Sequence, residues 1–152
     1  MINIFIPGDP DTVTAQQKGL KIKRSRTGKY YPQFYEKPEV RAANSKLAWQ
    51  LMDFKPAEPI TGPIELMIVW AFSVGKRPKR LINTFRETRP DLDNLNKSIM
   101  DILTRLKFWN DDSQVAKLLL MKRWVQDQDA GIHITINPIN AEQISEDGGA
   151  QL

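Results

Sequence analysis

Five charged residues in the middle of the chain have the types and spacing of a metal site. They are Asp91, Asp93, Lys97, Asp111 and Asp112. The first three share the segment D-L-D-N-L-N-K, and the last two lie in the turn-like segment N-D-D-S. A divalent ion such as Mg²⁺ needs several carboxylate oxygens at one point. Together, these side chains predict a site for a hard cation.

Each of these residues also has an ordinary structural interpretation. An aspartate before a helix is usually a cap, and the macrodipole favours negative charge there. Asp93 and Lys97 are four residues apart, so they share a helix face and could form a surface ion pair. The segment N-D-D-S is common turn chemistry. The residues alone leave both interpretations open.

An amphipathic helix over residues 92–105 must position the first group of acids. Pro90 followed by Asp91 predicts the helix entrance, with Asp91 as the N-cap residue. The apolar residues recur at the spacing of one buried helical face. They are Leu92, Leu95, Ile99, Ile102, Leu103 and Leu106.

The length of this helix limits how the two acidic groups can meet. A helix over residues 92–105 spans about 20 Å. Residues 106–112 can span at most about 23 Å, so the chain can return only if it is nearly extended. If it is not, Asp111 and Asp112 could meet the first group across a dimer interface instead.

The two motifs resemble the RusA family of Holliday-junction endodeoxyribonucleases. The match covers D-L-D-N-L-x-K from Asp91 to Lys97 and F-W-x-D-D-x-Q-V from Phe108 to Val115, at a fitting distance. Many members of that family are encoded by phages or prophages. The resemblance implies a homodimer that cleaves four-way DNA junctions and other branched DNA, in recombination and repair.

The resemblance also implies roles for individual residues. Asp91, Asp93 and Asp112 would bind Mg²⁺, with Mn²⁺ as a substitute, and Asp111 would be a neighbouring acid. The metal would activate a water molecule and neutralise charge on the phosphate. Lys97 would stabilise the phosphorane or the leaving oxygen. The catalytic set is therefore Asp91, Asp93, Lys97 and Asp112.

Composition excludes several other kinds of chemistry. The chain has 152 residues, no cysteine and a single histidine, His133. Disulfides, thiol catalysis and cysteine-based zinc sites are therefore excluded, and no histidine cluster is available. The sequence starts with M-I-N-I-F-I-P, which is too short for a secretory signal, and no apolar run reaches the length of a membrane span. We expect a cytoplasmic protein without a membrane partner.

The positive charge is concentrated away from the C-terminus. The net charge is +4, but residues 127–152 hold five of the 18 acids and none of the 22 bases. A basic body is typical of proteins with a polyanionic partner. The candidate DNA-binding residues fall in two segments, and solvated mobile loops are the alternative. They are Lys18, Lys21, Lys23, Arg24 and Arg26, then Lys76, Arg77, Lys79, Arg80, Arg86 and Arg89.

The first basic segment departs from the resemblance. Many members have Arg-rich motifs with proline directly after the first strand, whereas residues 12–20 here are T-V-T-A-Q-Q-K-G-L. The later K-x-K-R-x-R is the candidate substitute. Thr27-Gly28-Lys29 predicts a turn, and a hairpin there would expose tyrosines beside the bases, suited to stacking on nucleobases.

The remaining patterns predict an α+β fold. Strands are expected over residues 2–6, 64–72, 115–125 and 131–137, and a first helix over residues 38–53. The strand at 64–72 is apolar on both faces, which favours a central position. The last two strands are expected to form a hairpin through D-Q-D-A-G.

We therefore expect a mixed or antiparallel sheet backed by two helices. One RusA-like domain would occupy residues 1–139, followed by a disordered tail over residues 140–152.

Two other functional classes compete with a metal-dependent nuclease. A non-catalytic, structure-selective DNA-binding protein would explain the basic segments, but acids without a metal would repel the phosphate backbone. A nucleotide-sugar transferase could use a D-x-D metal site, yet the chain has no glycine-rich phosphate loop.

Overall fold

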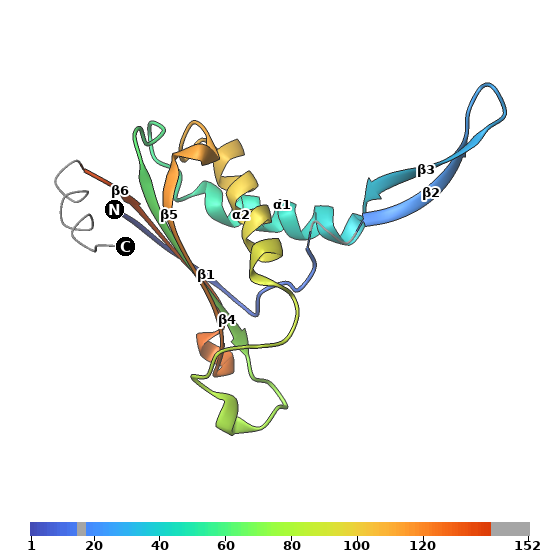
Figure 1. Ribbon diagram of the computed structural model, residues 1–152. Helices are drawn as coiled ribbons and strands as arrows, with labels where there is room; N and C mark the ends of the chain where they lie inside the picture. Colours follow the sequence, from blue (N-terminus) through green and yellow to red (C-terminus); the bar gives the residue numbers. More distant parts are fainter. Residues whose placement is uncertain (15–17, 141–152) are drawn as a thin grey trace, which may run out of the picture.

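A four-stranded mixed sheet carries both helices on one face, and a separate two-stranded hairpin extends from this body (Figure 1). The computed structural model describes residues 1–14 and 18–140. The expected disordered tail lies, apart from residue 140, outside the described residues. The α+β prediction, with a mixed sheet and two helices, is confirmed.

The sheet has the strand order β1-β6-β4-β5. Its strands are β1 (Ile2–Pro7), β4 (Ile64–Ser73), β5 (Val115–Val125) and β6 (Gly131–Pro138). β4 lies between β6 and β5, which confirms its predicted central position. Ile64, Leu66 and Ile68 are fully buried because they face the helices, and Met67 and Val69 on the opposite face are half-buried.

The predicted hairpin between β5 and β6 is wrong. β4 separates the two strands, pairing parallel with β5 and antiparallel with β6. A parallel pair needs a long crossover, and the helix between β4 and β5 supplies it. The short segment after β5 then crosses the end of β4, where Ser73 Oγ donates a 2.5 Å hydrogen bond to Asp127.

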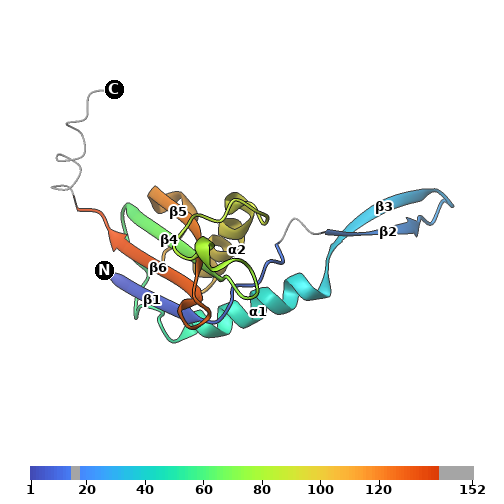
Figure 2. The ribbon, with the colours of Figure 1, turned by 90° about the horizontal axis from the view of Figure 1, so that it is seen from below.

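The two helices are α1 (Pro38–Met52) and α2 (Leu92–Arg105). The bounds of α2 match those predicted from its apolar spacing. The helices pack together on one side of the sheet, and the opposite side carries no helix (Figure 2). Phe108 and Trp109, directly after α2, are fully buried, and Trp109 Nε1 donates to Thr104 Oγ1 at 2.7 Å. They anchor the chain before the second acidic group.

The hairpin consists of β2 (Lys18–Arg24) and β3 (Tyr30–Glu36), which confirms the turn predicted at residues 27–29. We call residues 18–36 the arm. It projects past the N-terminal end of α1, away from the main sheet (Figure 1). Within the described residues, no helix has the length and apolarity needed to cross a membrane.

Candidate active site

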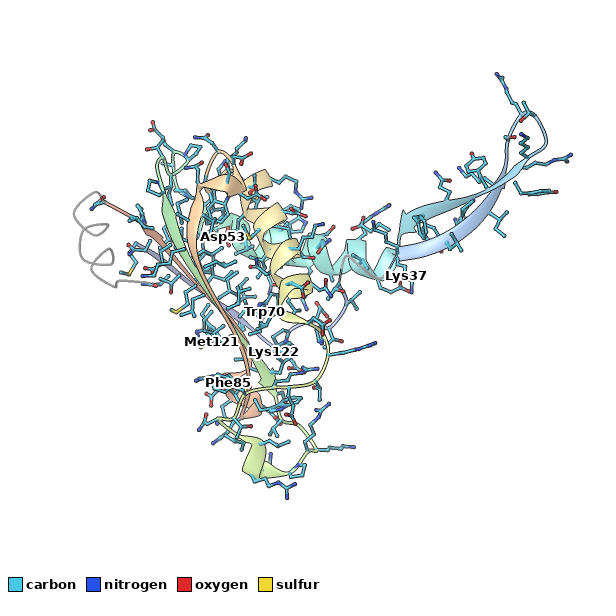
Figure 3. The ribbon with its side chains drawn as sticks, viewed as in Figure 1. Lys37, Asp53, Trp70, Phe85, Met121 and Lys122 are labelled. Carbon is cyan, nitrogen blue, oxygen red and sulfur yellow. The ribbon has the colours of Figure 1, made fainter. Side chains whose placement is uncertain are left out.

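Lys122 holds the turn that leads into α2. It lies in β5 opposite Trp70 of β4, on the side of the sheet that faces the helices (Figure 3). Its ammonium group donates 2.8 Å hydrogen bonds to the carbonyl oxygens of Thr88 and Pro90. Hydrogen bonds from a charged donor are stronger than neutral ones, so this contact fixes the backbone directly before Asp91. This role of Lys122 was not predicted, although a lysine within an apolar strand is an available signal.

Asp91 occupies the N-cap position of α2, as predicted, but its side chain does not cap the helix. The residue has the extended backbone of an N-cap (φ −74°, ψ 148°), and its carboxylate accepts no capping hydrogen bond. Capping is the ordinary reason for an aspartate at this position. The Asp91 carboxylate is therefore available for another partner.

Asp93 and Lys97 follow on α2, and both are exposed. The ion pairs between described residues are Arg41–Glu36, Lys46–Asp11 and Lys117–Glu65. The ordinary interpretation of Asp93 and Lys97 as a surface ion pair is thus not realised. Both side chains can turn toward a ligand beside Asp91.

A polar cavity of about 620 Å³ opens beside Asp91. Its lining combines one carboxylate with three arginines, a combination that suits a phosphate together with a cation. The lining residues are Thr12, Thr14, Arg77, Arg86, Arg89, Pro90, Asp91 and Asn94. Thr12, Thr14 and Asn94 were not predicted as site residues, because only the fold brings the segment after β1 to the start of α2.

Arg86 supports this cavity from below. It is only 9% exposed, and its guanidinium lies 4.0 Å from the ring centre of Phe72 and 4.7 Å from that of Trp124. Burial, together with the charge of Arg77, lowers the pKa of Arg86. Its side chain also donates to the carbonyl oxygen of Arg89. Most of Arg86 is thus engaged inside the protein, although it was predicted as a DNA contact.

The other basic residues of this loop remain outside. Lys76, Arg77, Lys79, Arg80 and Arg89 are all exposed. The guanidinium of Arg77 lies 4.6 Å from the ring centre of Trp124, at the entrance to the cavity. The loop therefore presents positive charge next to Asp91, where a phosphate backbone would approach.

Two acids outside the predicted site anchor the start of this basic loop. Asp9 accepts a 2.7 Å hydrogen bond from the backbone N–H of Ser73. Asp127 accepts from Ser73 Oγ and, at 3.1 Å, from the backbone N–H of Gly75. These hydrogen bonds lower the pKa of Asp127, which stays ionised. The acids hold the loop in place and are not free to bind a metal.

Asp111 and Asp112, although adjacent, have different surroundings. The Asp111 carboxylate accepts a 2.9 Å hydrogen bond from the backbone N–H of Ser113, and hydrogen bonding to Ser113 lowers the pKa of Asp111. Asp111 therefore caps the short 3₁₀ turn Asp112–Gln114. The turn-forming interpretation holds for Asp111, whereas Asp112 is exposed and performs no such cap.

Gln114 fixes the loop that carries Asp112. Its side-chain oxygen accepts from the backbone N–H groups of Asn110 and Asp111 at 2.8 and 3.2 Å. Its amide nitrogen donates to the carbonyl oxygens of Ile60 and Gly62 at 3.0 and 2.9 Å. The loop is thereby fastened to the chain just before β4, at the end of the sheet far from Lys122.

The two acidic groups do not meet within one chain. Val115 pairs with Ile64 and Lys122 with Trp70, so the groups lie at opposite ends of β5. Seven strand residues correspond to about 23 Å, and the length of α2 gives a similar separation of about 21 Å. Among the described residues, no three acidic or histidine side chains are grouped to hold a metal ion. The extended return of the chain that the sequence allowed does not occur.

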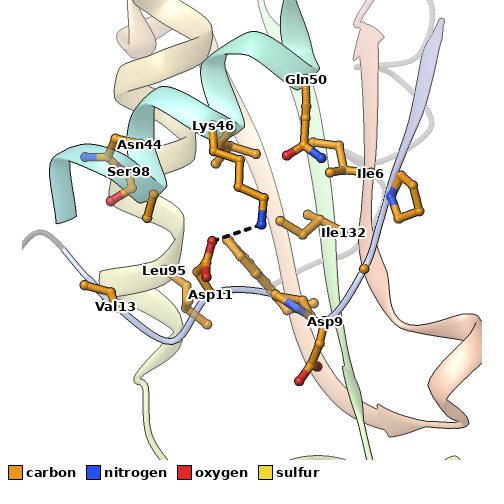
Figure 4. A pocket seen from close by; sticks show the side chains of 16 residues that line it. Ile6, Asp9, Asp11, Val13, Asn44, Lys46, Gln50, Leu95, Ser98 and Ile132 are labelled. Carbon is orange, nitrogen blue, oxygen red and sulfur yellow. Dashed lines mark ion pairs between the residues drawn. The ribbon is translucent and has the colours of Figure 1, made fainter. Parts of the chain in front are cut away.

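A second cavity, of about 50 Å³, lies between the segment after β1 and the two helices (Figure 4). Asp11 and Lys46 form a 3.6 Å ion pair at this cavity. Trp70 also lines it, and its buried Nε1 has no hydrogen-bond partner within the described residues. Such a volume suits ordered water. It is too small for a nucleotide, so the larger cavity beside Asp91 is the candidate site.

The arm separates its side chains into two faces. Leu20 pairs with Phe34 and Ile22 with Pro32, and directly opposed residues point to the same side of a sheet. Leu20, Ile22 and Phe34 are 57%, 73% and 66% exposed, which is unusual for large apolar residues. We call this side the apolar face of the arm. That these residues share one face was not predicted.

The opposite face of the arm is basic and aromatic. Lys21, Lys23, Tyr31 and Tyr35 share it, and Lys21 Nζ lies 4.6 Å from the centre of the Tyr35 ring. Lys18 and Arg24 lie at the ends of β2, and Arg26 lies in the exposed turn. The predicted DNA-binding residues of this segment are therefore all accessible.

Comparison with known proteins links both halves of this arrangement to one family. Residues 11–137 match the family described as "Endodeoxyribonuclease RusA". A protein of Lactococcus phage r1t, named "Crossover junction endodeoxyribonuclease rusA", is 33% identical over 131 residues. These residues are 86% of this chain and 93% of that relative.

Proposed function

We propose, because this chain belongs to the RusA family of endodeoxyribonucleases, that it resolves four-way DNA junctions by cutting phosphodiester bonds in a metal-dependent reaction. The observation that carries this proposal is the uncapped Asp91 carboxylate at an arginine-lined cavity. We place the activity in the cytoplasm, in DNA recombination and repair.

Asp91, Asp93 and Asp112 would hold Mg²⁺ or Mn²⁺. Their donors are all carboxylate oxygens, which these ions prefer, and none of the three is used as a cap or in one of the ion pairs above. When bound, the metal supplies an activated water and compensates charge on the phosphate. Asp111 is the neighbouring acid, which fixes the loop of Asp112.

Lys97 and the arginines act on the phosphate. Lys97 lies one helical turn after Asp93, so its amine can reach a phosphoryl oxygen bound near that carboxylate. Arg77 and Arg89 line the cavity and would orient the phosphate by paired hydrogen bonds. Lys122 keeps Asp91 at the edge of this cavity through its two backbone contacts.

DNA binding would extend from the cavity to the basic loop and the arm. Lys76, Lys79 and Arg80 are exposed beside the site, and the basic face of the arm adds a second positive surface. Because a four-way junction has two-fold symmetry and two strands to cut, the functional unit would be a homodimer.

The direct test is cleavage of a synthetic four-way junction compared with a linear duplex of matching sequence. With Mg²⁺ or Mn²⁺, we expect paired cuts in the junction and none in the duplex. Without a divalent ion, we expect binding and no cleavage. Junction binding without cleavage under every metal condition would instead favour the alternative, a non-catalytic DNA-binding protein.

A further inference from the structure

β5 has the sequence of an interior strand but lies at the edge of the sheet. Its run V-A-K-L-L-L-M is nearly continuous in apolar residues, which is typical of strands covered on both sides. On its inner side it pairs with β4 along its whole length. On its outer side, the segment Asn83–Arg86 pairs with β5 at residues 122–124. Within the described chain, no backbone pairing covers the outer edge of Leu118–Met121.

The middle of β5 is also open on both of its faces. Leu118 points to the side of the helices and is nevertheless 44% exposed, while its neighbour Leu66 in β4 is fully buried. Leu119 points to the opposite side and is 50% exposed. An exposed, apolar edge strand promotes aggregation unless another strand covers it. The edge at Leu118 and Leu119 therefore fits an additional strand.

The divided acidic site indicates which strand this is. Asp112 lies just before the start of β5, and Asp91 lies near Lys122, toward its end. If two copies of β5 pair antiparallel about a two-fold axis, the start of each strand lies beside the end of the other. Asp112 of one copy then lies at the same end as Asp91 and Asp93 of the other.

The position of the axis follows from the same geometry. Residues opposed across antiparallel strands point to the same face, so a residue on a two-fold axis perpendicular to the sheet faces its own copy. Bringing Val115 beside Lys122 of the partner subunit places this axis at Leu118 or Leu119. These are the two most exposed leucines of β5, an observation independent of the acids.

We propose that two copies of this chain pair through the outer edges of β5. Each active site then takes Asp91 and Asp93 from one protomer and Asp112 from the other. The inference rests on the proposed nuclease function and adds the surface and the partner that complete its site. It also explains why a single chain leaves its carboxylates in two groups.

Mixing two inactive variants tests the shared site. Asp93→Asn and Asp112→Asn each remove one ligand, and both residues are exposed, so folding is unaffected. A dimer with one copy of each variant has one site with both substitutions and one intact site. An equal mixture, refolded together to exchange subunits, should nick a labelled four-way junction at about a quarter of the wild-type rate.

The matched control mixes Asp93→Asn with Asp91→Asn. Both substitutions lie in the same half of the site, so every site in this mixture lacks a ligand and nicking stays absent. If the Asp93→Asn and Asp112→Asn mixture is equally silent while the wild type cleaves, the shared site is wrong and the nuclease function stands. A wild type that cleaves no branched DNA would instead remove the proposed function.

The absence of native cysteine allows a second test of the interface itself. Single cysteines are introduced by Leu118→Cys, Leu119→Cys and, as a control, Trp49→Cys on α1, where the tryptophan is 72% exposed. Under mild oxidation, the variant with cysteine at the axis should form a covalent dimer, because paired Cα atoms there lie within disulfide range. Cross-linking of neither β5 variant, or equal cross-linking of Trp49→Cys, would overturn the proposed pairing.

Discussion

At the scale of single residues, neighbouring acids of the same type have different tasks. Asp111 accepts a backbone hydrogen bond and caps a turn, whereas Asp112 beside it is exposed and does not cap. The same contrast separates Asp91 from an ordinary N-cap, because its carboxylate makes no capping contact. The hydrogen bonds of each carboxylate thus distinguish structural acids from candidate ligands, which residue type does not.

Substitution of the two adjacent acids should separate these tasks. Asp112→Asn removes a metal ligand, so we expect cleavage to fall at least about a hundredfold with no change in melting temperature. Junction binding should be equal or tighter, because a charge that repels phosphate is lost. Asp111→Ala removes the cap and should lower the melting temperature while cleavage persists below it. Equal loss of cleavage in both variants would assign Asp111 to the metal as well.

Lys122→Met tests a residue that acts only through the backbone. The substitution keeps an apolar stem but removes the donor to Thr88 and Pro90, which should cost about 2 kcal/mol of folding stability. Cleavage should fall at temperatures where the variant is fully folded, because Asp91 is no longer held in place. Chemical denaturation and junction cleavage, measured on the same preparation, check both effects. Full cleavage in the folded variant would show that Asp91 is positioned without Lys122.

At the scale of elements, the arm combines two kinds of nucleic-acid contact on opposite faces. Its basic face can neutralise phosphates, and its apolar face can contact bases that are unstacked at a branch point. A hairpin far from the main sheet adds nothing to the central core, and large exposed apolar residues are not needed for its own fold. We therefore expect the two faces to contribute to junction binding by different physical routes.

Two variants of the arm distinguish these routes. Ile22→Ser with Phe34→Ser should weaken junction binding by about 1–3 kcal/mol per lost stacking contact and leave the salt dependence unchanged. Lys21→Ala with Lys23→Ala should reduce the slope of log K against log salt concentration by nearly one unit for each lost phosphate contact. Binding titrations at several salt concentrations measure both quantities. Identical salt slopes for the wild type and the lysine variant would place the DNA away from the arm.

At the scale of the whole molecule, the metal site, the dimer and stability are linked. A ligand that binds only the folded state raises the melting temperature by mass action. If each metal ion contacts carboxylates of two protomers, it also favours association. Divalent ions should then stabilise the dimer more than the separate chains.

Thermal unfolding with and without divalent ions checks this linkage. Millimolar Mg²⁺ or Mn²⁺ should raise the melting temperature of the wild type above that in monovalent salt of equal ionic strength, increasingly so at higher protein concentration. Asp93→Asn should lose this increment. Lys97→Ala should retain it and still fail to cleave, because its proposed role is at the phosphate. A melting temperature indifferent to divalent ions would remove the metal site from this protein.

The sequence by itself determined the elements whose signals are local. The apolar spacing of α2 predicted its bounds, the turn Thr27-Gly28-Lys29 predicted the arm, and the two apolar faces of β4 predicted its central position. The two acidic motifs also identified the family. These signals arise from helix and strand periodicity and from turn chemistry, which neighbouring residues fix among themselves.

Only the tertiary structure decided which distant segments meet. β5 and β6 look like a hairpin in sequence, yet β4 lies between them because a buried, doubly apolar strand takes the centre of the sheet. The same topology places Lys122 under Asp91 and leaves Asp112 at the far end of β5. Spacing along the chain limits such distances without fixing them, because strand order depends on burial summed over the whole sheet.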